Sequence, residues 1–328
     1  MTLVSEGTDP VSDPRKGRGI TMTAGFEEPE TSSAFILSCE STVDVPYGYC
    51  ASRDIPVIFY SYFIDGQEYI DDMGRDPEAL PGFYRKLAAG SLPSTSQLNT
   101  IQYVEYFEPM LSEGHDLLHI CLGTGMTKSY ENACEAAQEL RERYPERKLL
   151  VLDSLCSSSG YGLLVDGAAD LRDRGGSLEE IAAWVEANRK NVHHQFYCTD
   201  LKYFKRSGRV SGATATVGAI LGICPIMRLN DEGRIIAYDK VRGKNAALRT
   251  TVRTMEAHAV GGADYAGKCW VCHSDCPETA ALLKDALEKH FPNIQGDVWV
   301  NDIGTIIASH CGPGTVAVFF FGDERAPG

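Results

Sequence analysis

Arg209 stands directly before a long apolar segment of this chain. Between Thr199 and Arg228 the sequence reads TDLKYFKRSGRVSGATATVGAILGICPIMR, which is polar and basic up to Ser211 and almost wholly small and apolar after it. The guanidinium of Arg209 offers forked N–H donors to a carboxylate or phosphate, and small residues leave room beside the backbone. The segment therefore suits an amphiphile with an anionic head and a long tail. A buried core helix capped by Ser211, with Arg209 merely solvated, is the alternative.

Two further segments carry clustered hydroxyl groups at expected helix starts. Gly123–Ser129 (GTGMTKS) follows an expected strand, but it lacks the spacing of a Walker phosphate loop, so nucleotide hydrolysis is not expected. Free N–H groups and the helix dipole favour anions at such a position. Thr124, Thr127 and Ser129 are therefore candidate head-group contacts, with simple helix capping by Thr127 or Ser129 as the alternative. Pro93–Gln97 (PSTSQ) offers a second cluster of the same kind.

A histidine opens the glycine-rich segment His310–Gly314 (HCGPG), which we expect to form a tight bend between apolar strands. Its side chain is either a head-group donor or a satisfied loop residue. These parts also allow a Ser/Thr–His lipid or ester hydrolase as an alternative function. The chain has no Gly-x-Ser-x-Gly elbow, however, and no orienting acid can be picked out.

The cysteines point away from metal and disulfide chemistry. Cys269, Cys272, His273 and Cys276 have types and spacings that could ligate zinc, and a zinc or redox protein is a second alternative. They fall in an expected strand, however, where Cys269 and Cys272 would point to opposite faces. The 11 cysteines are odd in number and scattered, so a disulfide framework is not expected. We expect no metal site and no cofactor.

Composition excludes several classes of protein. The chain has 328 residues and a formal net charge of −14, which disfavours nucleic-acid binding. No apolar run approaches the length needed to span a bilayer, and the N-terminus has no apolar signal core. A cytoplasmic location is the expectation.

The elements that must position these residues alternate along the chain. Residues 1–32 are expected to form a disordered tail. Strands are expected at 34–39, 56–64, 116–122, 148–154, 194–199, 268–273, 296–301 and 316–321, and a hairpin at 225–241. Helices are expected at 76–89, 96–113, 129–144, 163–174, 178–191, 245–259 and 277–290. This order predicts an α/β fold, with a mostly parallel sheet covered on both faces in the N-terminal domain and a second α/β domain after it. We place an N-terminal α/β domain at 33–165 and a C-terminal α/β domain at 166–328.

Taken together, the chemically informative segments resemble the DegV family. The match spans residues 35–322 and rests on ordered motifs. Ser38–Pro46 (SCESTVDVP) is similar to the family's Asp-Ser-Thr-Ala-Asp-Leu-Pro, Thr95–Gln97 to Thr-Ser-Gln-Pro-Ser, and Gly123–Ala133 to Ser-Ser-x-Leu-Ser-Gly-Thr-Tyr-x-x-Ala. Leu201–Ser211 is similar to Leu-x-x-Leu-x-x-Gly-Gly-Arg-Ile/Val-Ser, Lys240–Lys244 to Lys-x-Arg-x-x-Lys, and Ser309–Gly314 to Thr-His-x-Gly-Pro-Gly.

The resemblance implies a two-domain DegV-like fold and a function. The family includes the fatty-acid-binding subunits of bacterial fatty acid kinases, so it implies a non-catalytic protein that presents a long-chain fatty acid to a partner kinase for acyl-phosphate formation. By the same resemblance, the ligand-binding residues are Thr95, Ser96, Thr124, Thr127, Arg209 and His310, and partner docking or head-group binding falls to Arg242 and Lys244. The chain departs from the family at Glu40, at Leu98–Asn99 and at Gly123, where a hydroxyl donor is lost.

Overall fold

The computed structural model describes residues 35–210 and 222–328. The tail expected at 1–32 and the apolar segment that begins at Ser211 lie outside these ranges. None of the helices in the described ranges is both long and apolar enough to cross a membrane.

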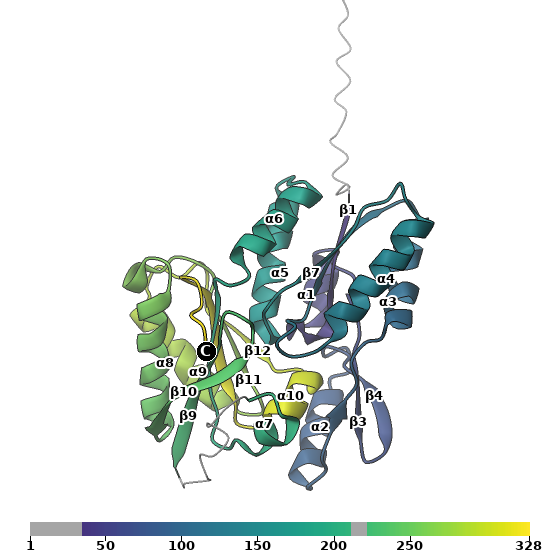
Figure 1. Ribbon diagram of the computed structural model, residues 1–328. Coiled ribbons are helices and arrows are strands. Elements are labelled where there is room, and N and C mark those ends of the chain that lie inside the picture. The colour runs from purple at the N-terminus through teal and green to yellow at the C-terminus, as the bar shows by residue number, and fades with distance from the viewer. Residues whose placement is uncertain (1–34, 211–221) are drawn as a thin grey trace, which may run out of the picture. The chain divides into compact units, whose positions relative to one another are not determined.

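The first sheet is wholly parallel and has the strand order β2-β1-β6-β7. Its strands are β1 (Phe35–Glu40), β2 (Val57–Ile58), β6 (Asp116–Cys121) and β7 (Leu149–Asp153). Helices pack on it at α3 (Thr100–Ser112), α4 (Ser129–Arg143), α5 (Ser158–Asp173) and α6 (Leu178–Asn188), with the short α1 (Tyr47–Ser52) beside β1 (Figure 1). The near-continuous burial of β1 and β6 is the pattern of a parallel sheet covered on both faces.

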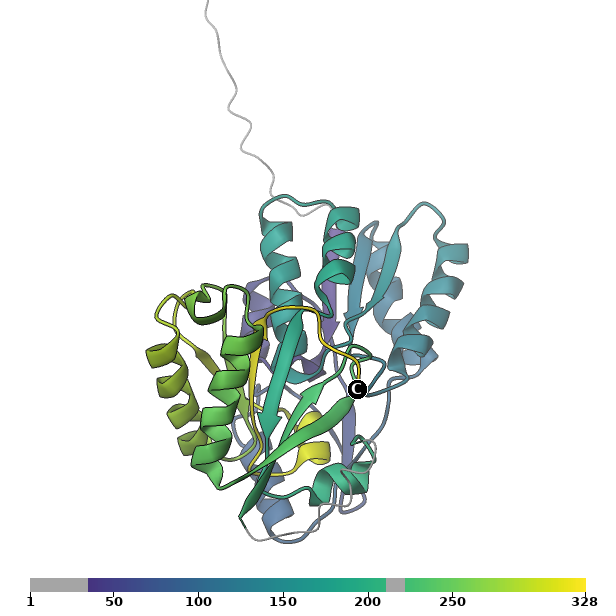
Figure 2. The same ribbon diagram turned by 60° about the vertical axis from the view of Figure 1, so that its left-hand side comes forward.

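The second sheet has six strands in the order β10-β9-β8-β13-β11-β12. Its strands are β8 (Val192–Tyr197), β9 (Ile223–Leu229), β10 (Ile235–Arg242), β11 (Trp270–His273), β12 (Trp299–Asp302) and β13 (Val316–Phe321), and only β11 and β12 pair in parallel. Helices α8 (Lys244–His258) and α9 (Pro277–His290) pack on one face, and α5 contacts strands of this sheet as well (Figure 2). Helix α5 therefore packs against elements of both sheets.

A small antiparallel sheet, β4-β3-β5, was not expected from the sequence. It contains β3 (Ser61–Ile64), β4 (Gln67–Ile70) and β5 (Ser94–Thr95), with α2 (Ala79–Ala88) between β4 and β5. The apolar run 56–64 predicted one strand, but it divides into β2 and β3, which belong to different sheets. Continuous hydrophobicity cannot reveal such a division, because the apolar run continues from β2 into β3. The consequence for function is the position of β5, which carries Thr95.

Most other predicted elements are confirmed, and one is wrong. The capping box at Ser177 forms as expected, and the hairpin 225–241 is β9 and β10. The bend expected at His310 is wrong, since His310 lies on helix α10 (Thr305–Cys311), and Gly312 follows with φ 68°. Within residues 35–210 and 222–328, the remaining elements are α7 (Lys202–Ser207) and two single-turn 3₁₀ helices at Ser41–Val43 and Gly262–Asp264. The domain division at residue 165 stays a prediction, and α5 runs across that position.

Candidate functional site

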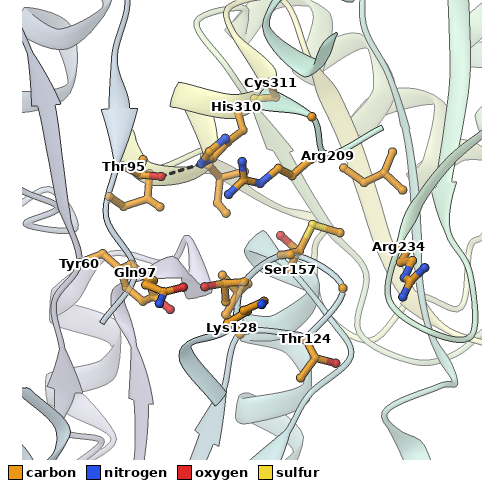
Figure 3. Close-up of a pocket in the computed structure, with 18 of the residues that line it drawn as sticks. Tyr60, Thr95, Gln97, Thr124, Lys128, Ser157, Arg209, Arg234, His310 and Cys311 are labelled. Atoms are coloured by element: carbon orange, nitrogen blue, oxygen red, sulfur yellow. Dashed lines mark hydrogen bonds between the residues drawn. The ribbon is translucent and has the colours of Figure 1, made fainter. Parts of the chain in front are cut away.

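A cavity of about 710 Å³ lies where the loops that follow β5 and β6 meet α7, α10 and the turn of the β9–β10 hairpin. Its volume is within the range of small-molecule sites. The six residues proposed as ligand contacts from the sequence all line it (Figure 3). The full lining consists of Tyr60, Thr95, Ser96, Gln97, Leu122, Thr124, Gly125, Met126, Thr127, Lys128, Ser157, Phe204, Gly208, Arg209, Arg234, Ile235, Ile306, Ile307, His310 and Cys311.

Thr95 and His310 form the polar centre of this cavity. The Thr95 Oγ1 and His310 Nε2 atoms are 2.9 Å apart, and β5 and α10 bring these residues together across the chain. Burial, together with the nearby cations Arg209 and Arg206, lowers the pKa of His310 to about 4. The imidazole is therefore neutral at pH 7, with one N–H donor.

Whichever ring nitrogen of His310 carries the proton, the Thr95–His310 pair keeps one donor that is not used within the pair. His310 Nδ1 is buried and has no hydrogen-bond partner among the residues that the structure describes. If Nε2 carries the proton and donates to Thr95, the Thr95 hydroxyl is free to donate elsewhere. If Thr95 donates to Nε2, the proton on Nδ1 is free instead. Either tautomer leaves one donor of the pair without a hydrogen-bond partner among the described residues.

Arginine side chains from the α7 region surround this pair. Arg206 donates to the carbonyl of Pro93 at 2.7 Å and to that of Ser309, so it ties α7 to the segment before Thr95 and to α10. Arg209 is exposed at the rim of the cavity, close to His310 (Figure 3). Its guanidinium is thus available to an anion that enters the cavity or to a surface that covers it.

Thr124 lies on the opposite side of the cavity from Thr95 (Figure 3). Its hydroxyl donates to Asp153 Oδ2 at 2.6 Å, and its backbone N–H donates to Oδ1 of the same carboxylate. The hydroxyl proton is therefore already engaged, and a carboxylate is its neighbour. This arrangement fits a structural role of Thr124 better than a contact with an anionic head group.

Glycine at position 123 has a steric cause. A Cβ there would lie 2.8 Å from Cys156 N and 2.9 Å from Cys156 O, which are backbone atoms and cannot swing away. Gly125 is closer still to the β9–β10 turn, since its Cβ would lie 2.2 Å from Gly233 O. The loop after β6 is therefore packed between two other backbone segments. Position 123 has no room for a side chain, so it cannot carry the hydroxyl that the family has there.

The start of α4 presents Thr127 and Lys128 to the cavity. Thr127 Oγ1 accepts the Ser129 N–H at 3.2 Å and lies 3.0 Å from Ser129 Oγ, while Ser129 Oγ also accepts the Leu98 N–H. Thr127 therefore satisfies one of the free N–H groups at the helix start, as the capping alternative held. Ser129 is fully buried and does not line the cavity.

An apolar extension continues from the polar cavity. A smaller space of about 60 Å³ shares Met126, Ser157, Phe204, Ile235, Ile307 and Cys311 with it and lies against β8, β9 and β13. The rest of its wall is mostly apolar and includes Phe196, Leu229, Ile303 and Phe319. The cavity as a whole is thus polar near Thr95 and apolar toward the second sheet.

Several lining residues were missed in the sequence, and two named residues lie elsewhere. Tyr60, Gln97, Lys128 and Arg234 line the cavity, but only Gln97 and Lys128 stood inside motifs that the sequence had singled out. Arg242 and Lys244 are exposed where β10 meets α8 and do not line it. Neither residue is therefore placed for a direct head-group contact in this cavity.

The alternatives based on cysteine and on hydrolysis find little support. Cys269 and Cys272 pack into different hydrophobic clusters on the two faces of the second sheet, so they do not converge on an ion. All 11 cysteines are free, as expected. Thr95 and His310 do resemble a nucleophile and base, but no described carboxylate bonds His310 Nδ1 to orient the ring.

The first two sheets define an α/β protein, and its cavity is polar near Thr95 and apolar toward the second sheet. The chain belongs to the DegV family, because the family model described as "Uncharacterised protein, DegV family" matches residues 37–323. It is 34% identical over 294 residues to a DegV domain-containing protein of Clostridium perfringens, which covers 89% of this chain and 99% of that protein.

Solved structures give the same family and fold. A DegV family protein from Thermus thermophilus, described for its fatty acid binding, is 26% identical and superposes with a TM-score of 0.77 over 88% of this chain and 99% of its own. A fatty acid binding DegV family protein from Streptococcus agalactiae is also 26% identical, with a TM-score of 0.74 over the same shares. The expected DegV-like α/β fold is therefore confirmed.

Proposed function

We propose that this chain binds a long-chain fatty acid, with the carboxylate beside Thr95 and His310 and the acyl tail in the rest of the main cavity, directed toward the apolar extension. The observation that carries this proposal is the cavity itself, in which a hydroxyl and a neutral histidine with one free donor stand at one end of an apolar space. Related DegV proteins are described as fatty acid binding, which supports the same ligand class.

The free energies favour such a division between head and tail. Burial of each methylene group contributes about 0.8 kcal/mol, so a long tail supplies most of the affinity, before the costs of association. A buried carboxylate without partners costs several kcal/mol. The Thr95–His310 pair and the Arg209 guanidinium supply donors and positive charge that reduce this cost.

We further propose that the protein presents the bound carboxylate to a partner kinase. In that reaction a carboxylate oxygen accepts the terminal phosphoryl group of ATP, ADP leaves, and an acyl phosphate forms. This chain has a formal net charge of −14, but the exposed Arg209 at the rim of the cavity, and Arg242 with Lys244 where β10 meets α8, give it local positive charge to which the kinase could dock. This role would place the protein in the cytoplasm, where ATP is available.

Identification of lipid extracted from the purified full-length protein tests the binding proposal. Denaturation followed by mass spectrometry should release a stoichiometric long-chain fatty acid. Protein that carries none and fails to take up added fatty acid would contradict the proposal. Turnover of acyl esters that disappears in His310→Ala would instead support the hydrolase alternative.

The kinase step needs a separate measurement. Lipid-loaded protein is incubated with ATP and a fatty acid kinase catalytic subunit, and acyl phosphate is trapped with hydroxylamine as the hydroxamate. We expect Arg242→Ala to lower the yield of hydroxamate while the dissociation constant for fatty acid stays unchanged. Normal yields from Arg242→Ala and Lys244→Ala would remove these residues from the docking surface.

A further inference from the structure

Four polar side chains lie on one face of two neighbouring strands in the core of the first sheet. Ser38 and Glu40 are two residues apart on β1, and His119 and Cys121 are two residues apart on β6. The strands are parallel, with Ser38 opposite His119. Since side chains alternate between faces, all four project to the same side, and each is 0% exposed.

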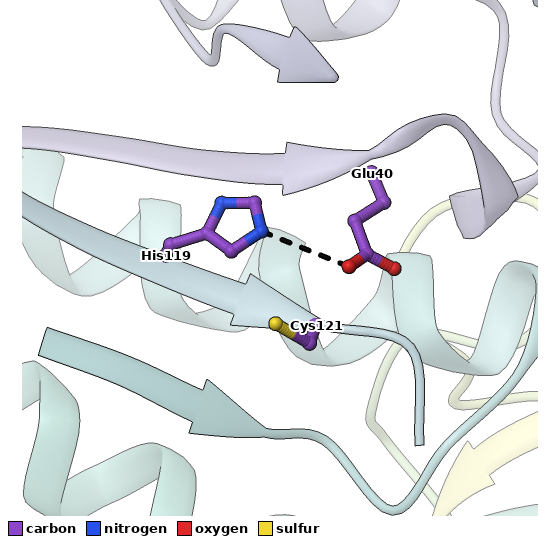
Figure 4. Close-up of side chains that lie close together, drawn as sticks. All are labelled: Glu40, His119 and Cys121. Carbon is purple, nitrogen blue, oxygen red and sulfur yellow. Dashed lines mark ion pairs between the residues drawn. The ribbon is translucent and has the colours of Figure 1, made fainter. Parts of the chain in front are cut away.

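Three of these side chains bring metal-binding atoms together. Glu40, His119 and Cys121 each offer one ligand atom, and these atoms all lie within 4.8 Å of one another (Figure 4). The separation of His119 Nε2 and Glu40 Oε1 is 3.8 Å, which is too long for a hydrogen bond. A tetrahedral ion at the usual Zn–N and Zn–O distances needs them only slightly closer.

His119 has an unsatisfied nitrogen that faces this cluster. Its Nε2 is buried and has no hydrogen-bond partner among the described residues. Its Nδ1 lies 2.8 Å from Ser38 Oγ. A proton on Nδ1 that is donated to Ser38 would leave the Nε2 lone pair free and hold the ring in place, which is how metal-binding histidines are commonly oriented. A buried nitrogen without a partner is costly, so it needs an explanation.

Glu40 is held as a ligand carboxylate usually is, by donors to its oxygens. Tyr103 OH donates to Oε1, while Tyr60 OH and the Leu122 N–H donate to Oε2 at 3.2 and 2.8 Å. Carboxylates that bind metal are themselves hydrogen-bonded in this way. Tyr60 and Leu122 also line the ligand cavity, so this cluster lies directly behind the cavity wall.

We propose that Glu40, His119 and Cys121 form a buried zinc site that ties β1 to β6. A thiolate, an imidazole and a carboxylate form a donor set that suits Zn²⁺, and the two anionic ligands would neutralise the ion in a region without solvent. Binding releases the Cys121 thiol proton to solvent. Burial raises the pKa of that thiol in the metal-free protein, with Glu40 adding to the effect. The site is independent of the proposed fatty acid binding.

The sequence alone predicts no metal site here, because Glu40 is far from His119 and Cys121 along the chain. Ser38 and Glu40 on β1 come together with His119 and Cys121 on β6 only when the two strands pair. A zinc ion there would fix Glu40, and through it the Tyr60 side chain and the Leu122 backbone at the cavity wall.

The zinc content of the full-length chain, expressed with added zinc, tests the proposal. Wild type should contain one equivalent of zinc, and Cys121→Ser should lose it. Cys39→Ser is the matched control, since Cys39 is equally buried on β1 but points to the other face of the sheet. Equal zinc in wild type and Cys121→Ser would overturn the proposal.

A second cluster has to be separated from this one. His193, His258 and Asp323 also lie within ligand distance of one another, and His258 and Asp323 are partly or fully exposed. The variant His258→Asn should keep the zinc of wild type. Zinc that disappears in His258→Asn but persists in Cys121→Ser would place the ion at the second cluster and refute the assignment.

A measurement on the unmodified protein guards against a variant that fails to fold. Wild type is unfolded with a chelator and refolded with Co²⁺, because a closed site must bind its ion during folding. Tetrahedral cobalt bound to a thiolate should give a sulfur-to-cobalt charge-transfer band, which Glu40→Gln should weaken and Cys39→Ser should not. Refolded wild type with native circular dichroism but no such band would overturn the proposal.

Discussion

Replacement of Thr95 by valine removes one hydroxyl group and keeps the shape of the side chain. In wild type this hydroxyl lies 2.9 Å from His310 Nε2, and it lines the cavity. In the proposed complex the Thr95–His310 pair supplies the donor to the fatty acid carboxylate. We therefore expect Thr95→Val to weaken fatty acid binding through the head group alone, with the apolar extension unchanged.

The magnitude follows from the charge of the acceptor. A hydrogen bond to a charged group contributes about 1.5–3 kcal/mol, which corresponds to roughly a 10- to 150-fold rise in the dissociation constant. The variant also leaves His310 Nε2 without its partner in the free protein, which destabilises the fold by about 1–3 kcal/mol. Thr95→Ser keeps a hydroxyl and should retain most of the affinity.

Equilibrium competition with a labelled long-chain fatty acid measures this effect on delipidated protein. Ser207→Ala is the matched control, because Ser207 Oγ donates to Phe204 O at 3.1 Å and contacts His310 O, yet Ser207 does not line the cavity. Thr95→Val with an unchanged dissociation constant, or with the same loss as Ser207→Ala, would refute the placement of the carboxylate.

Three further predictions concern the same region. The pKa of His310 is lowered to about 4 in the folded protein from an ordinary 6.5, so the contribution of His310 to stability is complete above pH 6.5 and is lost as the pH falls toward 4. Denaturant unfolding at pH 7 and at pH 5 measures this loss. Between these two pH values the free energy of unfolding of wild type should fall by about 2 kcal/mol more than that of His310→Gln, which keeps all the other titrating groups. Gly123→Ala should destabilise the folded protein by about 1–3 kcal/mol in thermal unfolding, since its Cβ would lie 2.8 Å from a backbone nitrogen. Gly48→Ala is the control: a Cβ there has nothing within 4 Å, so this variant should be neutral or stabilising. Equal losses of stability in the two variants would show that the close approach at Gly123 is not the cause. Thr124→Val should lower fatty acid affinity less than Thr95→Val, because its hydroxyl already donates to a carboxylate; the reverse order would move the head group to the other side of the cavity.

Local patterns in the sequence predicted most of the elements correctly. Pro277 at the start of α9 and the Ser177 capping box are complete within a few residues, so their helices could be located without knowledge of the fold. The apolar run that forms β13 is likewise complete within six residues, so this strand could also be located from the sequence. Helix α10 was missed because its apolar residues are too few to show a helical period, and glycine follows His310 closely.

The site residues could be named from motifs, but their roles could not. Thr95 and Thr124 looked equivalent as hydroxyls before expected helices, and the structure separates them, since Thr124 is bonded to Asp153 while Thr95 is bonded to His310. Asp153 stands at the end of β7, and nothing local connects it with the loop after β6. Pairing of parallel strands creates that contact.

The sequence by itself determined the alternation of elements, the family, and six of the residues that line the cavity. Motifs can do this because backbone conformation and helix capping depend on near neighbours. Only the tertiary structure decided which hydroxyl is free, which histidine nitrogen lacks a partner, and that Arg242 and Lys244 lie outside the cavity. These properties depend on distances between segments far apart in the chain and on exclusion of water, and both arise only when the sheets and helices have packed. Arg209, which stood at the mouth of an apolar segment in the sequence, stands in the fold at the rim of a cavity whose polar centre is built by β5 and α10.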